Sequence, residues 1–301
     1  MGSHKNIDDE MNTNHPKYSV LPYPRERLVI VEGGRIAARR HTVHGLIEVD
    51  ATAARRAIRE HKERTGDTFS FTAFVIACLG KAIEEYKMVH AYRDWRNQLI
   101  IFDEVDVNTM VEIEMDGRKV TLPHFIRAAN RRTAREIHDE IRAVQAQPEK
   151  TNEFGIFWFA RLPQFIRDIF YWFVYKNPHW LKKSFCTVGV TAIGMFGKGG
   201  GWAIPFGVHT LDVALGGINE KPGVVDGRIE IREYLCLTLM FDHDIVDGAP
   251  AARFTQRFKE LIEGGYGLCE QDPNASLHTM GANALSQVIG FAAMEKDQHH
   301  D

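Results

Sequence analysis

The chain has 301 residues, of which 44% are hydrophobic and 26% are charged. This composition is typical of globular proteins and excludes a disordered, collagenous or coiled-coil chain. Lys and Arg number 37 against 40 Asp and Glu, so the formal net charge of −3 provides no broad positive surface for nucleic acid. The four cysteines stand far apart without a CxxC pair, and no apolar stretch approaches the roughly 20 residues that span a bilayer. We therefore expect a soluble cytoplasmic protein with reduced thiols and no metal site.

Polar tails are expected at both ends of one α/β domain. Residues 1–17 are rich in Asn, Asp and His and predict a mobile tail. Residues 266–301 predict a second tail with one apolar run, Ala282–Met294, that could dock as a helix. Residues 18–265 mix strand and helix signals along one long core without an internal repeat, and they predict a single domain.

Within that domain, apolar residues that alternate predict strands, and apolar residues three and four apart predict helices. The expected strands are Arg27–Val31, His44–Val49, Leu99–Phe102, Val105–Glu114, Lys119–Leu122, Cys186–Ile193, Leu211–Leu215 and Ile229–Met240. The expected helices are Ala51–Arg64, Phe71–Tyr86, Ala134–Gln147 and Pro250–Glu263. Asp50 is expected to cap the first helix, and Thr133 with Glu136 to form a capping box before the third. Turns are expected at Gly33–Gly34 and Asp116–Gly117.

The residues around the end of the last strand carry the most specific pattern in the chain. In Phe241–Phe254, a hydrophobic strand ends at His243 and a helix begins about six residues later. Such corners are where α/β proteins tend to place their sites. The ordinary pKa of histidine suits proton transfer near pH 7, and Asp247 and Gly248 complete an HxxxDG pattern. On spacing alone, the alternative is a structural histidine beside an ordinary Asp-Gly turn.

The HxxxDG pattern and the Ala-Pro-Ala-Ala-Arg-Phe run after it resemble the signature of the dihydrolipoamide acyltransferases. These are the second components of the 2-oxo acid dehydrogenase complexes, and chloramphenicol acetyltransferase has a similar histidine motif and the same fold. Further segments resemble the family in the same order, from about Arg35 to Glu263. They are Leu46–Thr52, Asp103–Asn108, Pro123–Arg127, Ala134–Arg142 and Ile193–Gly197.

The resemblance implies a two-layer α/β sandwich of the coenzyme A-dependent acyltransferase type, assembled as a homotrimer or a larger trimer-based assembly. The active site would lie in a channel between subunits, entered by coenzyme A from one end and by an acceptor such as dihydrolipoamide from the other. His243 would be the general base that deprotonates the attacking thiol. Thr191 falls where the family has a hydroxyl side chain, usually serine, that donates to the oxyanion. Asp247 would hold the turn by pairing with an arginine, for which the candidates are Arg25, Arg27 and Arg35.

Three features depart from the family pattern. Asp244 stands where the family usually has a basic residue, and its carboxylate could alter the acceptor or the histidine pKa. Too few residues precede the catalytic match for a lipoyl domain, so a lipoyl-bearing protein is expected to supply that group in trans, or the acceptor is another thiol, an amine or an alcohol. Residues 151–185 form an aromatic insertion in place of a short polar connector. Extra core or trimer contact is expected there, with a lid, an acyl-chain pocket, or a docking surface for a partner or membrane as alternatives.

Other interpretations stay open beside the acyltransferase. The chain could be a non-catalytic scaffold subunit of a 2-oxo acid dehydrogenase-like complex, although a scaffold needs no base in a channel. A metal-dependent phosphohydrolase would bind its metal through the His-Asp pair within Asp242–Asp244, but His209 and His278 lack the ligand spacing of the further histidines that it needs. The loop Gly197–Gly201 could cradle phosphate, yet it lacks the GxxxxGK[ST] spacing and a plain loop is favoured. Thr191 could equally be a strand threonine whose hydroxyl is satisfied by its neighbours.

Overall fold

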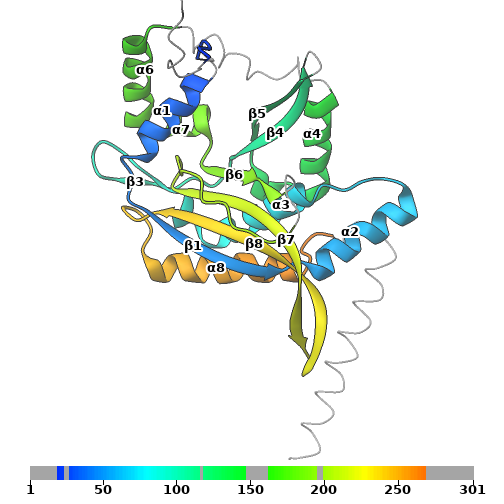
Figure 1. The fold of residues 1–301 in the computed structure, drawn as a ribbon. Coiled ribbons are helices and arrows are strands. Elements are labelled where there is room, and N and C mark those ends of the chain that lie inside the picture. The colour runs from blue at the N-terminus through cyan, green and yellow to red at the C-terminus, as the bar shows by residue number, and fades with distance from the viewer. Residues whose placement is uncertain (1–18, 24–26, 116–117, 147–161, 195–198, 269–301) are drawn as a thin grey trace, which may run out of the picture.

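The computed structural model describes residues 19–23, 27–115, 118–146, 162–194 and 199–268 (Figure 1). Their centre is a six-stranded sheet in the order β1-β8-β7-β6-β4-β5. Strand β6 is parallel to both of its neighbours, and the other pairings in this sheet are antiparallel. The six strands are β1 Thr42–Asp50, β4 Val107–Met115, β5 Arg118–Ile126, β6 Val188–Ala192, β7 Leu211–Val225 and β8 Arg228–Asp242. A separate small sheet pairs β2 Tyr92–Arg93 with β3 Leu99–Ile100.

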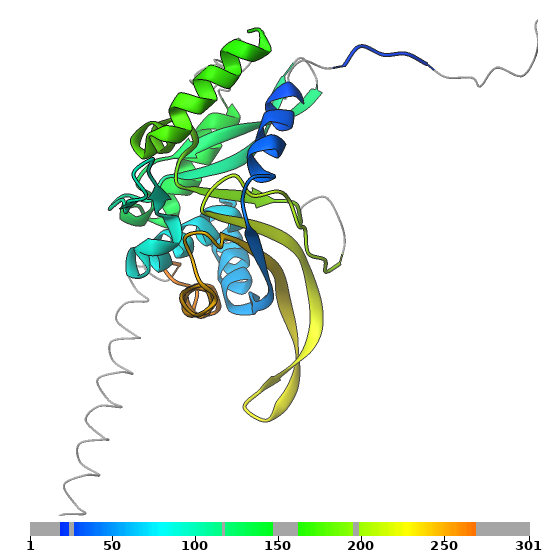
Figure 2. The same ribbon diagram turned by 90° about the vertical axis from the view of Figure 1, so that its left-hand side faces the viewer.

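Helices α4 (Ala134–Ala146) and α8 (Gly248–Glu263) pack beside α3 (Phe71–Glu85) on one face of the large sheet and make the second layer with it, whereas α1, α6 and α7 lie away from α3 (Figures 1 and 2). The residues of α3 are apolar on all sides, so ten of its 15 positions are buried and the helix forms the centre of the core. Phe254 and Phe258 of α8 are fully buried in the same core. The α-helices are α1 Arg27–Ala37, α2 Thr52–Thr65, α3 Phe71–Glu85, α4 Ala134–Ala146, α6 Gln164–Lys176, α7 Pro178–Phe185 and α8 Gly248–Glu263. Short 3-10 turns occupy Lys87–His90 and Ala129–Arg131.

Most elements expected from the local pattern are confirmed with shifts at their ends, but β7 continues to Val225, well beyond the strand expected at Leu211–Leu215. The capping box is present, because the backbone N–H of Thr133 donates to the Glu136 carboxylate at 2.7 Å and the N–H of Glu136 donates to the Thr133 hydroxyl at 3.2 Å. The Asp50 carboxylate accepts from the N–H of Thr52 at 2.9 Å, although Ala51 is the N-cap residue of α2. The turn expected at residues 116–117, the tail at 1–17 and the apolar run at 282–294 lie outside the described residues.

The strand expected at Arg27–Val31 is wrong, and so is the turn expected at Gly33–Gly34, because both segments belong to helix α1. The β-branched run favours a strand locally. Contacts with the rest of the fold decide otherwise, since the buried carboxylate of Glu32 accepts from Arg35 at 3.1 Å and from Gln164 of α6 at 2.8 Å. Helix α1 thus exists because it packs against an element far along the chain.

Strands β7 and β8 continue beyond the sheet as a two-stranded arm (Figures 1 and 2). Its tip turns at Asp226 and Gly227, which have φ angles of 49° and 77°. Three large apolar side chains on the arm are 77%, 79% and 76% exposed, respectively Val224, Ile229 and Ile231. Exposed apolar side chains gathered on a projecting arm are typical of a surface that another molecule covers.

Candidate active site

The corner predicted at the end of β8 is present, and Asp242 holds it in place. A five-residue loop joins β8 to α8 there. The carboxylate of Asp242, itself 6% exposed, binds the guanidinium of Arg40 and accepts from the backbone N–H of Asp244 at 3.2 Å. The backbone carbonyl of Asp242 accepts from the N–H of Val246 at 3.0 Å, and Val246 is buried. These contacts fix the loop that carries His243.

The side chain of His243 is exposed at this corner, while its backbone is held by a hydrogen bond from its N–H to the carbonyl of His41 at 2.9 Å. The neighbouring Asp244 carboxylate lies 2.9 Å from Nδ1 of His41 and 3.9 Å from the guanidinium of Arg93. The hydrogen bond to His41 lowers the pKa of Asp244, and the charges of His41 and Arg93 lower it further. The imidazole of His243 is thus accessible on a fixed backbone, which suits a general base.

Asp247 occupies the N-cap position of α8 in an extended conformation, with φ −76° and ψ 163°. Its side chain makes no capping hydrogen bond, and in the described part of the chain it forms no ion pair with an arginine. Arg35 binds Glu32 within α1, Arg27 is exposed, and Arg25 lies outside the described residues. The negative charge of Asp247 suits the positive end of the helix.

A buried ion pair, which the motif analysis did not assign, lies at the start of β7 beside the end of β8. Nδ1 of His209 is 2.6 Å from the Asp212 carboxylate, and its Nε2 is 2.6 Å from the backbone carbonyl of Phe185. Both ring nitrogens of His209 are therefore engaged, one by a side chain and one by the backbone, and the ring is held in a single orientation. Burial raises the pKa of Asp212, but His209, assisted by Arg40, outweighs that effect and leaves the pKa lowered. The three-residue spacing of His209 and Asp212 was the only local signal of the pair.

Thr191 and His243 do not meet within one chain. Thr191 is half-buried on β6, pairs with Ala214 of β7, and is thereby level with Thr238 of β8. His243 lies five residues further along β8 and two strands away. At about 3.3 Å per residue and about 4.8 Å per strand, the two residues are about 19 Å apart. A single chain therefore does not bring the expected base and the expected oxyanion donor together.

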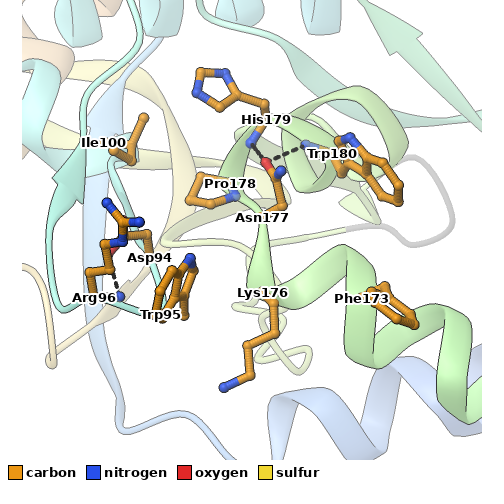
Figure 3. Close-up of a pocket in the computed structure, with 10 residues that line it drawn as sticks. All are labelled: Asp94, Trp95, Arg96, Ile100, Phe173, Lys176, Asn177, Pro178, His179 and Trp180. Atoms are coloured by element: carbon orange, nitrogen blue, oxygen red, sulfur yellow. Dashed lines mark hydrogen bonds between the residues drawn. The ribbon is translucent and has the colours of Figure 1, made fainter.

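A cleft of about 480 Å³ opens between the turn that joins β2 to β3 and the junction of α6 and α7 (Figure 3). The same turn connects the cleft to the histidine corner, because Arg93 at its start lies 3.9 Å from Asp244. Aromatic and cationic side chains line the cleft, among them Trp95, Arg96, Phe173, Lys176 and Trp180. Such a lining suits a ligand that combines an apolar or flat group with an anionic one.

Three other hypotheses concern the glycine-rich loop, a metal site and a membrane-spanning helix. Residues 197 and 198 of the glycine-rich loop lie outside them, and Gly201 accepts from the N–H of Gly217 at 2.9 Å, so this end of the loop continues the sheet ladder. Across the described ranges, no group of three His, Cys, Asp or Glu side chains is placed to hold a metal ion. No helix in those ranges is long and apolar enough to cross a membrane.

The fold is shared with acyltransferase cores of known structure. A probable dihydrolipoamide acetyltransferase from Listeria monocytogenes superimposes with a TM-score of 0.61 at 20% identity, covering 82% of this chain and 95% of that chain. The cubic core of a pyruvate dehydrogenase multienzyme complex superimposes with a TM-score of 0.64 at 15% identity, covering 89% of this chain and 99% of that chain. The fold is thus the two-layer α/β sandwich of the coenzyme A-dependent acyltransferases, and the expected fold class is confirmed.

Sequence comparison points to one family within that class. Residues 179–268 match the family model described as 2-oxoacid dehydrogenases acyltransferase (catalytic domain). The lipoamide acyltransferase component of the branched-chain alpha-keto acid dehydrogenase complex of Pseudomonas putida is 40% identical over 80 residues, which are 26% of this chain and 18% of that protein. The dihydrolipoyllysine-residue acetyltransferase component of the Bacillus subtilis pyruvate dehydrogenase complex is 26% identical over 220 residues, 71% of this chain and 43% of that protein. The chain resembles the catalytic domain of the 2-oxo acid dehydrogenase acyltransferases, as its motifs predicted, and spans less than half the length of these relatives.

Proposed function

We propose that this protein is a coenzyme A-dependent acyltransferase that moves an acyl group between coenzyme A and a thiol such as dihydrolipoamide. The observation that carries the proposal is the exposed imidazole of His243, on a backbone fixed by His41 and Asp242, at the strand-to-helix corner of an acyltransferase fold. A thiol with an ordinary pKa of about 8.5 is mostly protonated at pH 7, so the reaction needs a base at this point.

In the proposed reaction, the imidazole of His243 takes the proton from the acceptor thiol. The resulting thiolate attacks the carbonyl carbon of the acyl-CoA, a carbon–sulfur bond forms, and the carbonyl oxygen becomes an oxyanion. Collapse of this intermediate breaks the carbon–sulfur bond to coenzyme A, whose thiolate recovers the proton from the imidazolium. The carboxylate of Asp244, which contacts His41 and Arg93, adds a negative charge to the loop that carries the imidazole.

The oxyanion donor in this proposal is Thr191 of a neighbouring copy in a homotrimer or a larger trimer-based assembly. The separation of about 19 Å along and across the strands supports a site shared between subunits. The exposed apolar side chains of Val224, Ile229 and Ile231 on the β7–β8 arm support contact with another copy. In this arrangement Asp247 has a positioning role at the start of α8.

Coenzyme A and the acceptor are expected to reach the base from opposite ends of the intersubunit channel, and the lipoyl group to arrive on another protein. The relatives support this assignment, because two of them are named as components of the pyruvate and branched-chain dehydrogenase complexes. We place the protein in the cytoplasm, and its buried free thiols at Cys78 and Cys236 support a reducing compartment.

Thiol release from a panel of acyl-CoA thioesters with acceptors, free dihydrolipoamide included, tests the function. The wild-type protein is expected to release coenzyme A, and His243→Ala to lower the rate by about 10²–10⁴, the usual contribution of a general base. His44→Ala is a matched control, because His44 is an exposed histidine on β1. Equal turnover by His243→Ala and wild type would show that His243 is not the general base. Absence of coenzyme A release with every pair of substrates would favour the interpretation of the chain as a non-catalytic scaffold subunit.

A further inference from the structure

Helix α6 turns its apolar face toward solvent and its polar face toward the rest of the protein. Its inner face, which meets the rest of the protein, carries mainly polar side chains, and its outer face is apolar. The inner residues are Gln164, Arg167, Tyr171, Val174 and Tyr175, which are buried or half-buried. The outer residues Phe165, Ile166, Ile169, Trp172 and Phe173 are respectively 64%, 39%, 55%, 58% and 53% exposed. An amphipathic surface helix normally has the opposite arrangement.

Polar contacts hold the inner face in this orientation. The guanidinium of Arg167, whose side chain is 4% exposed, lies 3.8 Å from the buried Glu32 carboxylate of α1. Gln164 donates to the same carboxylate at 2.8 Å and accepts from Arg167 at 2.5 Å. Rotating α6 to hide its aromatic side chains would expose or separate these buried groups, which is costly. The outward orientation of the aromatic face is therefore built into the fold.

The outer face of α6 lies apart from the surface proposed to join subunits. In both ribbon views, α6 and the β7–β8 arm stand at opposite ends of the molecule (Figures 1 and 2). Contacts made through the arm do not by themselves cover α6. The apolar face of α6 is therefore open to an occupant other than a molecule that covers the arm.

The charge around this face is positive, although the chain as a whole has a net charge of −3. The exposed charges of α6 and α7 are Lys176 and Lys183 against one acidic residue, Asp168, whereas Arg167 and Lys182 are largely buried in ion pairs with Glu32 and Glu104. Lys176 is exposed at the end of the apolar face, with its ammonium group 5.9 Å from the centre of the Trp172 ring. Trp180 of α7 is 56% exposed and lies with Phe173 on the side of the cleft away from Asp94 and Arg96 (Figure 3).

We propose that the outer face of α6 binds the surface of a bilayer that contains anionic phospholipids. Exposed Trp and Phe side chains with a lysine at the edge are suited to the boundary between acyl chains and headgroups, where aromatic rings and lysine side chains place their apolar and polar parts. At about 1.5 Å per residue, this 13-residue helix is about 20 Å long and lies along the surface. The positive charge beside the apolar face favours an anionic lipid surface over an uncharged groove on another protein.

Sedimentation of the full chain with vesicles tests the proposal, using phosphatidylcholine alone and an equimolar mixture with phosphatidylglycerol. The wild-type protein is expected to sediment with the mixed vesicles, to bind phosphatidylcholine weakly, and to be released by high salt. The triple change Ile169→Ser, Trp172→Ser and Phe173→Ser is expected to lower the partition coefficient by about tenfold or more through lost apolar burial. Lys176→Glu is expected to lower it about thirtyfold, because one charge near an anionic surface changes binding about fivefold and the reversal acts twice.

Matched controls separate the face from general surface effects. Met110→Ser changes a side chain that is 43% exposed on β4, and Lys62→Glu reverses an exposed charge on α2; both are expected to bind like wild type. Failure of the wild-type protein to bind either kind of vesicle overturns the proposal, as does undiminished binding by the triple variant. A smaller mass for the triple variant by light scattering without lipid also overturns it, because the face would then join copies of the chain.

Discussion

The guanidinium of Arg40 binds the carboxylate of Asp242, although 202 positions separate the two residues in the chain. Their side chains are 13% and 8% exposed, so little water reaches the ion pair. The pair ties the segment before β1 to the last residue of β8, and His243 follows directly. The candidate base is therefore placed by an ion pair between residues that have no place in the motif itself.

Removing the cation of this pair is expected to destabilise the fold. Arg40→Ala should lower the free energy of unfolding by about 3–5 kcal/mol, because it leaves a nearly buried carboxylate without its partner. Urea unfolding measures the change, and the double variant Arg40→Ala with Asp242→Asn should recover part of it. Arg39→Ala is the control, since Arg39 is the exposed neighbour. Equal loss in the Arg39 and Arg40 variants would show that the buried pair contributes nothing specific.

A methyl group at Gly189 is expected to disrupt the buried His209–Asp212 pair, because a Cβ atom there would overlap the Asp212 carboxylate. Gly189→Ala should lower the free energy of unfolding by about 1–3 kcal/mol, the usual cost of overpacking a filled interior. Gly34→Ala in α1 is the control, since a Cβ atom there meets nothing within 4 Å. Thermal unfolding should show Gly34→Ala unchanged or slightly stabilised; a Gly189→Ala protein that melts with wild type contradicts the close packing.

The pH dependence of stability is expected to report on His90. Burial, the largest effect, lowers the pKa of His90 to about 4 in the folded protein. The unfolded chain binds the proton near about pH 6.5. The contribution of the neutral His90 ring to the free energy of unfolding is therefore complete above that pH, and it is lost as the pH falls toward 4. At about 1.4 kcal/mol for each pH unit between the two values, the loss approaches about 3 kcal/mol.

Urea unfolding between pH 7 and pH 4.5 tests this assignment. His90→Gln lacks the titrating ring, so its stability should fall less steeply with acidification than that of wild type. His44→Gln removes an exposed histidine and should keep the wild-type slope. Identical slopes for wild type and His90→Gln would mean that the ring binds its proton equally well in the folded and the unfolded chain.

Mixing two inactive variants tests the shared site. Thr191→Ala is expected to lose about 10²–10³ of the rate with its oxyanion donor, and His243→Ala to lose its base. When the two are unfolded and refolded together, a site between a subunit with an intact base and a neighbour with an intact donor regains both groups. Random trimers should recover about one quarter of wild-type activity. Activity no greater than the sum of the two separate variants would mean that no site combines the base of one subunit with the donor of its neighbour.

The sequence alone was sufficient where neighbours along the chain decide the structure. The apolar spacing in Phe71–Tyr86 predicted α3 because a helix that is apolar on all sides can only be buried. The Thr133–Glu136 capping box formed because both of its hydrogen bonds are local. The corner at His243 was predictable for the same reason, since a strand, a histidine and a helix start follow one another within a few residues.

Tertiary structure decided the features that depend on residues far apart in the chain. The run at Arg27–Val31 has the local pattern of a strand, yet it is helical because Glu32 is buried against α6. The partner of Asp242 and the outward orientation of Trp172 carry no local signal. Leaving a buried polar or charged group without a partner costs free energy, so buried groups form ion pairs and fix the orientation of a helix. Which groups are buried depends on which distant segments of the chain pack together in the fold.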